Sequence, residues 1–213
     1  NYNYLGFNMQ EVPKPVRQAV AYALNQHRVA QQVFKNRAEP AYHTVSPAVY
    51  PGGAGAYDQH AQEEYPYGYN QADLESARQL MEEAGYTSDD PYQLSWLQYQ
   101  SPTWLSVAQT LRDKLSSVHI EMEIEQAPFS TLLERVRNLN VEAFTLAWIV
   151  PWAAPDAFVK HLDPARSDPT QGAAEAFVAW PNENEAAQRA IEAWERIENN
   201  PRANDEDTQI RNE

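Results

Sequence analysis

The chain has 213 residues, with 30 acidic and 16 basic side chains and a formal net charge of −14. Such a charge argues against a protein that binds nucleic acid or anionic membrane surfaces, since both demand a basic face. The absence of cysteine excludes disulfides and thiolate metal sites, and no run of about 18 apolar residues is available to cross a bilayer.

The acidic residues are spread along the chain rather than gathered in a tail. In molar salt the Debye length is about 3 Å, so their mutual repulsion would be screened. We therefore favour a salt-adapted source over an ordinary acidic protein from a mesophile.

The N-terminal part predicts a short aromatic strand followed by helices. The strand contains Tyr2, Tyr4 and Phe7. A helix then begins near Pro15, where proline is tolerated in the first turn, and its apolar residues recur at three- and four-residue spacing. A second helical piece follows over residues 29–34.

Residues 40–69 show no clear period and are rich in proline and glycine. They predict a long irregular loop, which in a compact domain is usually functional or mobile. The run Gly52–Gly53–Ala54–Gly55 has no following lysine, so a turn is favoured over a phosphate-binding loop.

The stretch YNQADLESARQLMEEAGY, residues 69–86, predicts an amphipathic helix with defined ends. Asn70 or Asp73 can accept hydrogen bonds from the first backbone N–H groups, and Gly85 suits the left-handed position after the last turn. Its apolar residues lie on one face, as expected for a helix packed on a core.

After Gly85 the pattern becomes strand, helix, strand, helix, strand, and a long helix follows. Such alternation predicts an α/β fold with a βαβαβ mixed sheet flanked by helices. We expect residues 199–213 to form a flexible tail. The predicted elements are strands at 92–96 and 120–124, helices from 102 and from 129, a buried strand at 143–150, and a helix at 184–199.

No catalytic or cofactor motif is present, and the five histidines are scattered without the spacing of metal ligands. The sequence therefore predicts neither an enzyme, nor a cofactor, nor a metal site. An enzyme with an unrecognised site is kept as an alternative, for which a hydrolase screen is the test.

The candidate site is the segment AWIVPWAAPDAFVKHL, residues 147–162, which leaves a buried strand and enters a proline-rich turn. In open α/β sheets, ligands bind beyond the carboxyl ends of the strands. Trp148 and Trp152 would then form walls of a cleft; aromatic packing beneath the turn is the alternative. Asp156 is a plausible helix N-cap.

Two further groups belong to the candidate site. Tyr99 and Gln100 follow a strand and precede a helix N-terminus, which favours an anionic or carbonyl group. Arg135 and Arg137 are candidate anion contacts, with exposed surface arginines as the alternative.

Several of these segments resemble the family 5 extracellular solute-binding proteins, the peptide- and nickel-type receptors of ABC importers. The strings VRQAVAYALNQHRV and YNQADLESARQLMEEAGY carry the resemblance, together with residues 147–162. The matching stretches follow one another in the family's order: 2–36, 69–86, 92–125 and 140–162.

The resemblance implies that residues 1–213 are a single lobe, the C-terminal ligand-binding lobe of a larger two-lobed protein whose N-terminal lobe is missing. It implies capture of a peptide or other small solute between the lobes and delivery to ABC permease subunits, with no enzyme activity. The location would be extracellular, either membrane-anchored as a lipoprotein or periplasmic. A non-transport sensor or a peptide chaperone of the same fold is the alternative.

The resemblance also assigns the ligand-binding residues. Trp148 and Trp152 would stack on the solute, and the backbone around Ile149 and Val150 would bind it through hydrogen bonds. Tyr99 and Gln100 would add polar contacts. Where peptide-binding members carry a charged aspartate and an arginine, this chain has Pro151 and Thr145, which weakens the case for ordinary zwitterionic peptides. Asp156, if it is not the helix cap, would substitute for the missing charge. Arg137 is added as a candidate anion contact from its place in the sequence, not from the resemblance.

Overall fold

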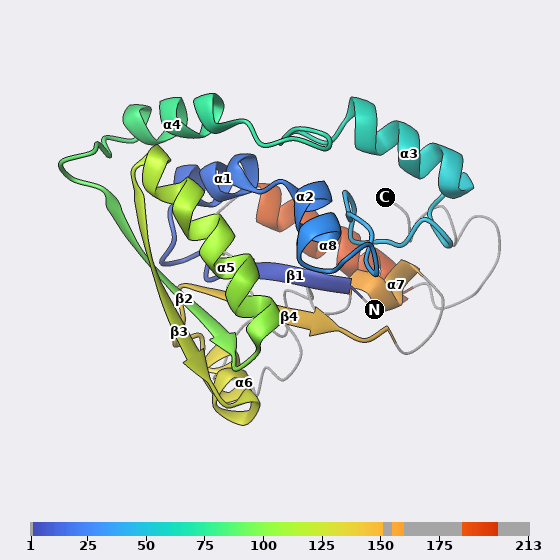
Figure 1. The fold of residues 1–213 in the computed structure, drawn as a ribbon. Coiled ribbons are helices and arrows are strands. Elements are labelled where there is room, and N and C mark those ends of the chain that lie inside the picture. The colour runs from blue at the N-terminus through green and yellow to red at the C-terminus, as the bar shows by residue number, and fades with distance from the viewer. Residues whose placement is uncertain (1, 151–154, 160–184, 200–213) are drawn as a thin grey trace.

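The computed structural model describes residues 2–150, 155–159 and 185–199 (Figure 1). The elements are β1 Tyr2–Phe7, α1 Lys14–Ala23, α2 Gln26–Gln32, α3 Gly53–Glu63, α4 Leu74–Glu83, β2 Tyr92–Tyr99, α5 Pro102–Leu115, η1 Ser116–Val118, β3 Ile120–Ala127, α6 Phe129–Arg137, β4 Ala143–Trp148, α7 Pro155–Val159 and α8 Glu185–Asn199.

The described strands form one four-stranded mixed sheet in the order β1-β4-β2-β3. β2 pairs in parallel with both β3 and β4, whereas β1 pairs antiparallel with β4 along its whole length. The chain therefore runs β2–α5–β3–α6–β4, with the second crossover passing over β2. This confirms the α/β class and the βαβαβ mixed sheet expected from the sequence.

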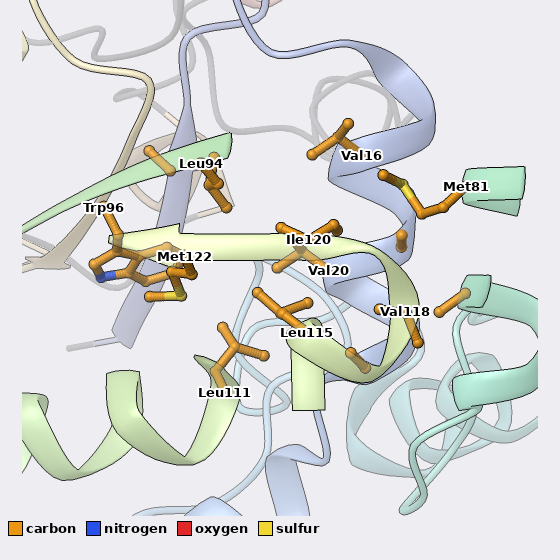
Figure 2. Packing of buried hydrophobic residues seen from close by; sticks show 14 of the residues in the cluster. Val16, Val20, Met81, Leu94, Trp96, Leu111, Leu115, Val118, Ile120 and Met122 are labelled. Carbon is orange, nitrogen blue, oxygen red and sulfur yellow. The ribbon is translucent and has the colours of Figure 1, made fainter. Parts of the chain in front are cut away.

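Helices cover both faces of the sheet. On one face, α1, α4 and α5 enclose a core with the inward side chains of β2 and β3. Figure 2 shows Val16, Met81 and Leu115, from those three helices, converging on Ile120 of β3. On the other face, α6 packs on a smaller core, which we call the α6-side core. Its buried members are Leu97, Ala127, Leu132, Val136, Val141, Phe144 and Leu146.

The local signals around α4 act as predicted. The Asp73 carboxylate accepts a hydrogen bond from the Ser76 N–H at 2.9 Å, so Asp73 is the N-cap residue. Asn70 instead takes a positive φ of 58° and accepts a hydrogen bond from the Tyr42 hydroxyl. Gly85 has a φ of 92°, the left-handed conformation that ends the helix.

The prediction of an irregular loop across residues 40–69 is wrong in one stretch, because Gly53–Glu63 forms helix α3. Gly52 and Gly53 do make the expected turn, with φ of 78° and 77°. The sequence did not predict this helix because only two of its side chains, Tyr57 and Ala61, are buried. A stripe of two residues is too short to stand out from its surroundings.

Two boundaries near the end of the described chain also differ from expectation. The last buried strand ends at Trp148 rather than Val150, and Ile149 is 72% exposed. Helix α7 begins at Pro155, so Asp156 lies within its first turn and is not its N-cap. The expected flexible tail, 199–213, lies outside the described residues apart from its first residue, which ends α8.

Candidate functional site

The three parallel strands β2, β3 and β4 have their carboxyl ends at the same end of the sheet, and we call the residues there the carboxyl edge. It comprises residues 99–101, which start with the last residue of β2, residues 128–129 after β3, and residues 148–150, which start with the last residue of β4. β4 leaves β2 after two paired positions, the last joining Leu97 to Phe144, and then follows β1. A divergence of adjacent strands at this end is where open α/β sheets bind ligands.

Tyr99 and Phe129 form an aromatic pair at this edge. Their ring centroids lie 6.1 Å apart at an interplanar angle of 88°, an edge-to-face contact. Phe129 is 55% exposed although it begins helix α6. The Gln100 N–H donates to the carbonyl oxygen of Ala127 at 3.2 Å, which ties the loop after β2 to the end of β3.

The loop after β2 is also held from below. The Ser101 side chain caps α5 by accepting from the Trp104 N–H. The side-chain amide of Gln98, which is fully buried, lies 3.2 Å from both the Trp104 carbonyl oxygen and the Leu105 amide nitrogen. A buried amide with both ends engaged fixes its surroundings, so Tyr99 and Gln100 are carried on a rigid support.

Trp148 is half-buried at the end of β4 and is attached to α7. Its indole N–H donates to the carbonyl oxygen of Ala157 at 2.8 Å. Beside it in the sheet register, the Tyr2 hydroxyl donates to the Phe158 carbonyl oxygen at 2.7 Å, and the two rings of Tyr2 and Phe158 stack. Burial strongly raises the pKa of Tyr2, which keeps the phenol neutral and able to donate.

Trp148 makes the contacts of the packing alternative, and its role as a cleft wall stays a prediction. Its polar edge holds α7 across the ends of β1 and β4, as in the packing alternative, and part of its surface remains accessible. Next to it, Ile149 is exposed and Val150 is half-buried. Every residue of the carboxyl edge is uncharged: Tyr99, Gln100, Ser101, Pro128, Phe129, Trp148, Ile149 and Val150.

The predicted arginines are not brought to this edge. Arg137 ends α6, on the side of the sheet where β4 begins, and is exposed. Arg135 makes an ion pair with Glu125, and its Nε donates to the Asn140 carbonyl oxygen at 3.2 Å. Thr145 is buried inside the sheet opposite Leu5, so it adds no charge at the cleft.

Of the remaining predicted residues, only Asp156 is in the described part of the chain. Asp156 is the second residue of α7, whose carbonyl groups bind Trp148 and Tyr2. Trp152 and Pro151 lie outside the described residues. Five of the predicted residues therefore lie at the carboxyl edge: Tyr99, Gln100, Trp148, Ile149 and Val150. Arg137 lies away from this edge.

Phe129 is the edge residue that sequence reasoning missed. Its spacing from Leu132 and Leu133 predicts an inward-facing helix position, yet Leu132 and Val136 are the buried residues of α6. The available signal was its place two residues after the end of β3, close to the carboxyl end of the strand, as Gln100 is close to the end of β2.

A separate cavity of about 680 Å³ lies along β1. Its walls come from residues 2–5, from α2 and the segment after it, and from Trp104 and Phe158. The Asn8 N–H donates to Glu142, so the even-numbered residues of β1 bond to β4. The N–H and C=O groups of Asn3 and Leu5 therefore point outward, and no hydrogen bond joins them to another described residue.

Metal sites and membrane-spanning helices are both absent from the described ranges. No group of three or more histidine, aspartate or glutamate side chains there is placed to hold a metal ion. Within the same residues, no helix combines the length and the apolar character needed to cross a membrane.

Comparison with known proteins gives a family match over most of the chain. A model described as bacterial extracellular solute-binding proteins, family 5 Middle, matches residues 1–168. The match includes β1 to β4, and therefore the whole carboxyl edge.

Individual relatives are much longer than this chain. A di/tripeptide-binding protein 2 of Pseudomonas aeruginosa is 28% identical over 148 residues, which are 68% of this chain and 26% of that protein. A dipeptide-binding protein of Escherichia coli is 24% identical over 168 residues, 76% of this chain and 29% of that one. The crystal structure of Haemophilus influenzae OppA in complex with RPPGFSPFR is similar in fold, with a TM-score of 0.75 and 16% identity over 99% of this chain and 39% of its own.

Proposed function

We propose, because this chain belongs to the family 5 bacterial extracellular solute-binding proteins, that its carboxyl edge is one wall of a solute-binding cleft. The protein would be the substrate-binding component of an ABC importer and would break no bond. A solute would favour the closed arrangement of two lobes, and a membrane permease would bind that closed form.

The observation that carries this proposal is the exposed apolar surface at the carboxyl edge. Four large hydrophobic side chains are exposed in the described part of the chain, and two of them, Phe129 and Ile149, lie at this edge. Exposing apolar surface costs free energy, and clustered exposure marks a surface that binds something. Tyr99 packs edge-to-face against Phe129, and Trp148 directly precedes Ile149 in the chain.

The proposed contacts follow from what each residue offers. Phe129 and Trp148 would stack on the solute, and Gln100 would donate or accept a hydrogen bond through its side chain. The backbone of Ile149 and Val150, just past the end of β4, would add further hydrogen bonds. Trp152 and Asp156 are kept as proposed contacts, whereas Arg137 is left out because of its place in the fold.

The proposed solute is a small molecule that packs an apolar or aromatic group on this edge. The names of the relatives from Pseudomonas aeruginosa and Escherichia coli favour a short peptide. The carboxyl edge has no charged side chain to pair with a peptide terminus. A terminal charge would therefore be bound by Asp156, by the other lobe or by water.

The test is the replacement of Phe129 by alanine in the full-length protein. We expect the dissociation constant for a bound dipeptide such as Ala-Phe to rise by about tenfold or more, equivalent to about 1.4 kcal/mol, because a stacking aromatic surface is lost. Isothermal titration calorimetry measures this change.

The matched control is Leu74→Ala, which removes another exposed hydrophobic side chain, from α4 and away from the edge. Its affinity should equal that of the unaltered protein. Equal affinities for all three proteins would remove the carboxyl edge from the binding site.

We also propose that this chain is one lobe of a larger two-lobed protein, since it spans only 26–29% of the length of the relatives from Pseudomonas aeruginosa and Escherichia coli. The outward edge of β1 supports this. Unpaired backbone groups on a sheet edge are a template for another strand. The backbone groups of Asn3 and Leu5 have no partner among the described residues and lie beside a cavity of about 680 Å³. A strand from the rest of the protein would satisfy them.

Native mass spectrometry of the protein isolated from its own host in high salt tests several of these points together. The polypeptide mass reports the full length, an added lipid mass would reveal a membrane anchor, and a co-purified small mass would report the solute class. A polypeptide no longer than 213 residues would overturn the two-lobed proposal. It would leave the proposal that the carboxyl edge binds a solute to be decided by calorimetry.

An extracellular location, either cell-surface or periplasmic, follows from the family as a further proposal. The net charge of −14 supports a salt-adapted source. In that case the urea midpoint of unfolding should rise clearly between low and molar KCl, where charge repulsion is screened. A midpoint that does not depend on salt would contradict this part.

A further inference from the structure

Helix α3 is attached to the rest of the molecule mainly by aromatic rings. In Figure 1 it lies at the end of a long connection, away from the sheet. Its buried side chains are Tyr57 and Ala61. The segment it packs on, residues 42–50, supplies His43 and Val45 to the wall of the cavity along β1. The attachment of α3 therefore bears on the shape of that wall.

The rings form a cluster of four: His43 and Tyr50 from the segment, and Tyr57 and His60 from α3. The centroids of His43 and His60 lie 5.3 Å apart, and those of His43 and Tyr50 lie 5.1 Å apart. Tyr50 and Tyr57 are 5.4 Å apart. The Tyr57 hydroxyl oxygen accepts a hydrogen bond from the Tyr42 N–H at 2.8 Å.

The hydrogen bond at His43 defines its protonation state. The Val45 N–H donates to His43 Nδ1 at 2.9 Å, and a backbone N–H can only donate. Nδ1 must therefore be unprotonated, so His43 is neutral with its proton on Nε2. Adding a proton to Nδ1 would break this bond and create a positive charge facing His60.

We propose that His43 and His60 form an acid-sensitive clasp, which holds α3 against the cavity wall while the His43 imidazole is neutral and releases it when His43 is protonated. The Glu64 carboxylate lies 3.1 Å from His60 Nδ1. His43 has no carboxylate partner among the described residues, so its charge is the one that the cluster resists.

The other titratable groups around His43 do not offset this effect. Tyr50 and Tyr57 stay neutral, since burial raises the pKa of both. The remaining groups on the cavity wall are Tyr2, Tyr4, Arg37 and Glu39. Burial, and then the charge of His60, lower the pKa of His43 below its ordinary value of 6.5.

The sign of the pH effect follows from this lowered pKa. The clasp contributes its full stability above the unfolded-state pKa of about 6.5, and this stability is lost as the pH falls through the lower folded-state pKa. The release therefore takes place below about pH 6.5, the ordinary pKa of histidine.

The decisive variant is His43→Asn, measured in this chain. An asparagine side chain can accept the N–H two residues ahead, so it keeps the Val45 bond but cannot be protonated there. We expect the hydrogen-exchange protection factors of Tyr42, Val45 and α3 amides in the unaltered chain to fall about tenfold or more between about pH 7.5 and about pH 5. In His43→Asn they should change by less than about twofold.

Two references make the result specific. His27→Asn removes a histidine that bonds only Gln31 on α2, and should behave as the unaltered chain does. The Leu94 amide in β2 reports on global unfolding and should keep its protection. Unchanged protection of Val45 in the unaltered chain at acidic pH would overturn the clasp whatever the variants do, and so would an equal loss in His43→Asn.

Discussion

Replacing Phe144 with alanine is expected to lower the free energy of unfolding by about 3–5 kcal/mol, the usual cost of removing a buried phenylalanine and leaving a cavity. Phe144 is fully buried in the α6-side core. Its ring lies over Gly6 of β1 and meets the Tyr4 ring edge-on at 6.2 Å. Urea unfolding followed by tryptophan fluorescence, with salt held constant, measures the loss.

The matched control for this prediction is Phe129→Ala, the same chemical change at a residue that is 55% exposed. A largely exposed ring contributes little burial, so the unfolding free energy should change by less than about 1 kcal/mol. The two variants should also differ in solute affinity, because only Phe129→Ala is expected to weaken solute binding. Equal losses of unfolding free energy in the two variants would contradict the stabilising role of the buried Phe144 ring.

Gly6→Ala is expected to cost about 1–3 kcal/mol, because it overpacks the contact between β1 and β4. A Cβ atom at Gly6 would lie 2.1 Å from Cζ of Phe144 and 2.5 Å from Cε2. The backbone of Gly6 belongs to a regular strand paired with Phe144, so the expected cost comes from this steric clash. Either the Phe144 ring or strand β1 must move to relieve this clash. Tyr2 and Trp148 lie on the same two strands, so a shift of β1 relative to β4 would also change their positions.

A double-mutant cycle tests that explanation. In a Phe144→Leu background the ring is gone, so Gly6→Ala should cost clearly less, with a coupling energy of about 0.5 kcal/mol or more. Gly55→Ala in α3 is the control, since no other atom lies within 4 Å of its added Cβ. It should be neutral or stabilising, because alanine favours a helix. Additive costs at Gly6 and Phe144 would contradict the clash.

The periodic and punctuated parts of the chain were predictable from the sequence. Helix α4 begins after Asp73, whose side chain caps it, and ends before Gly85, whose backbone takes the left-handed conformation. The alternation of strands and helices after residue 92 led to the βαβαβ sheet, since parallel neighbours need crossover helices. The weakly patterned parts were not predictable: α3 has only two buried residues, and β4 ends two residues earlier than its apolar run.

For the candidate site, the order of residues indicated where to look, because whatever follows a parallel strand lies at the carboxyl edge. Tyr99, Gln100 and Trp148 were found in this way. The sequence could not show that Arg137 stands apart from them, or that Phe129 is exposed, because both depend on where α6 begins and how it turns on the sheet.

The sequence by itself determined the class of fold, the family and the uncharged character of the candidate edge, because periodicity, motif order and residue type are properties of a linear chain. Only the tertiary structure decided which strands are neighbours and that Trp148 is hydrogen-bonded to α7. It also decided that the His43 ring, in the segment before α3, contacts the His60 ring on α3. Those facts arise from contacts between residues far apart in the chain, whose free energy depends on burial and geometry that local preferences do not encode.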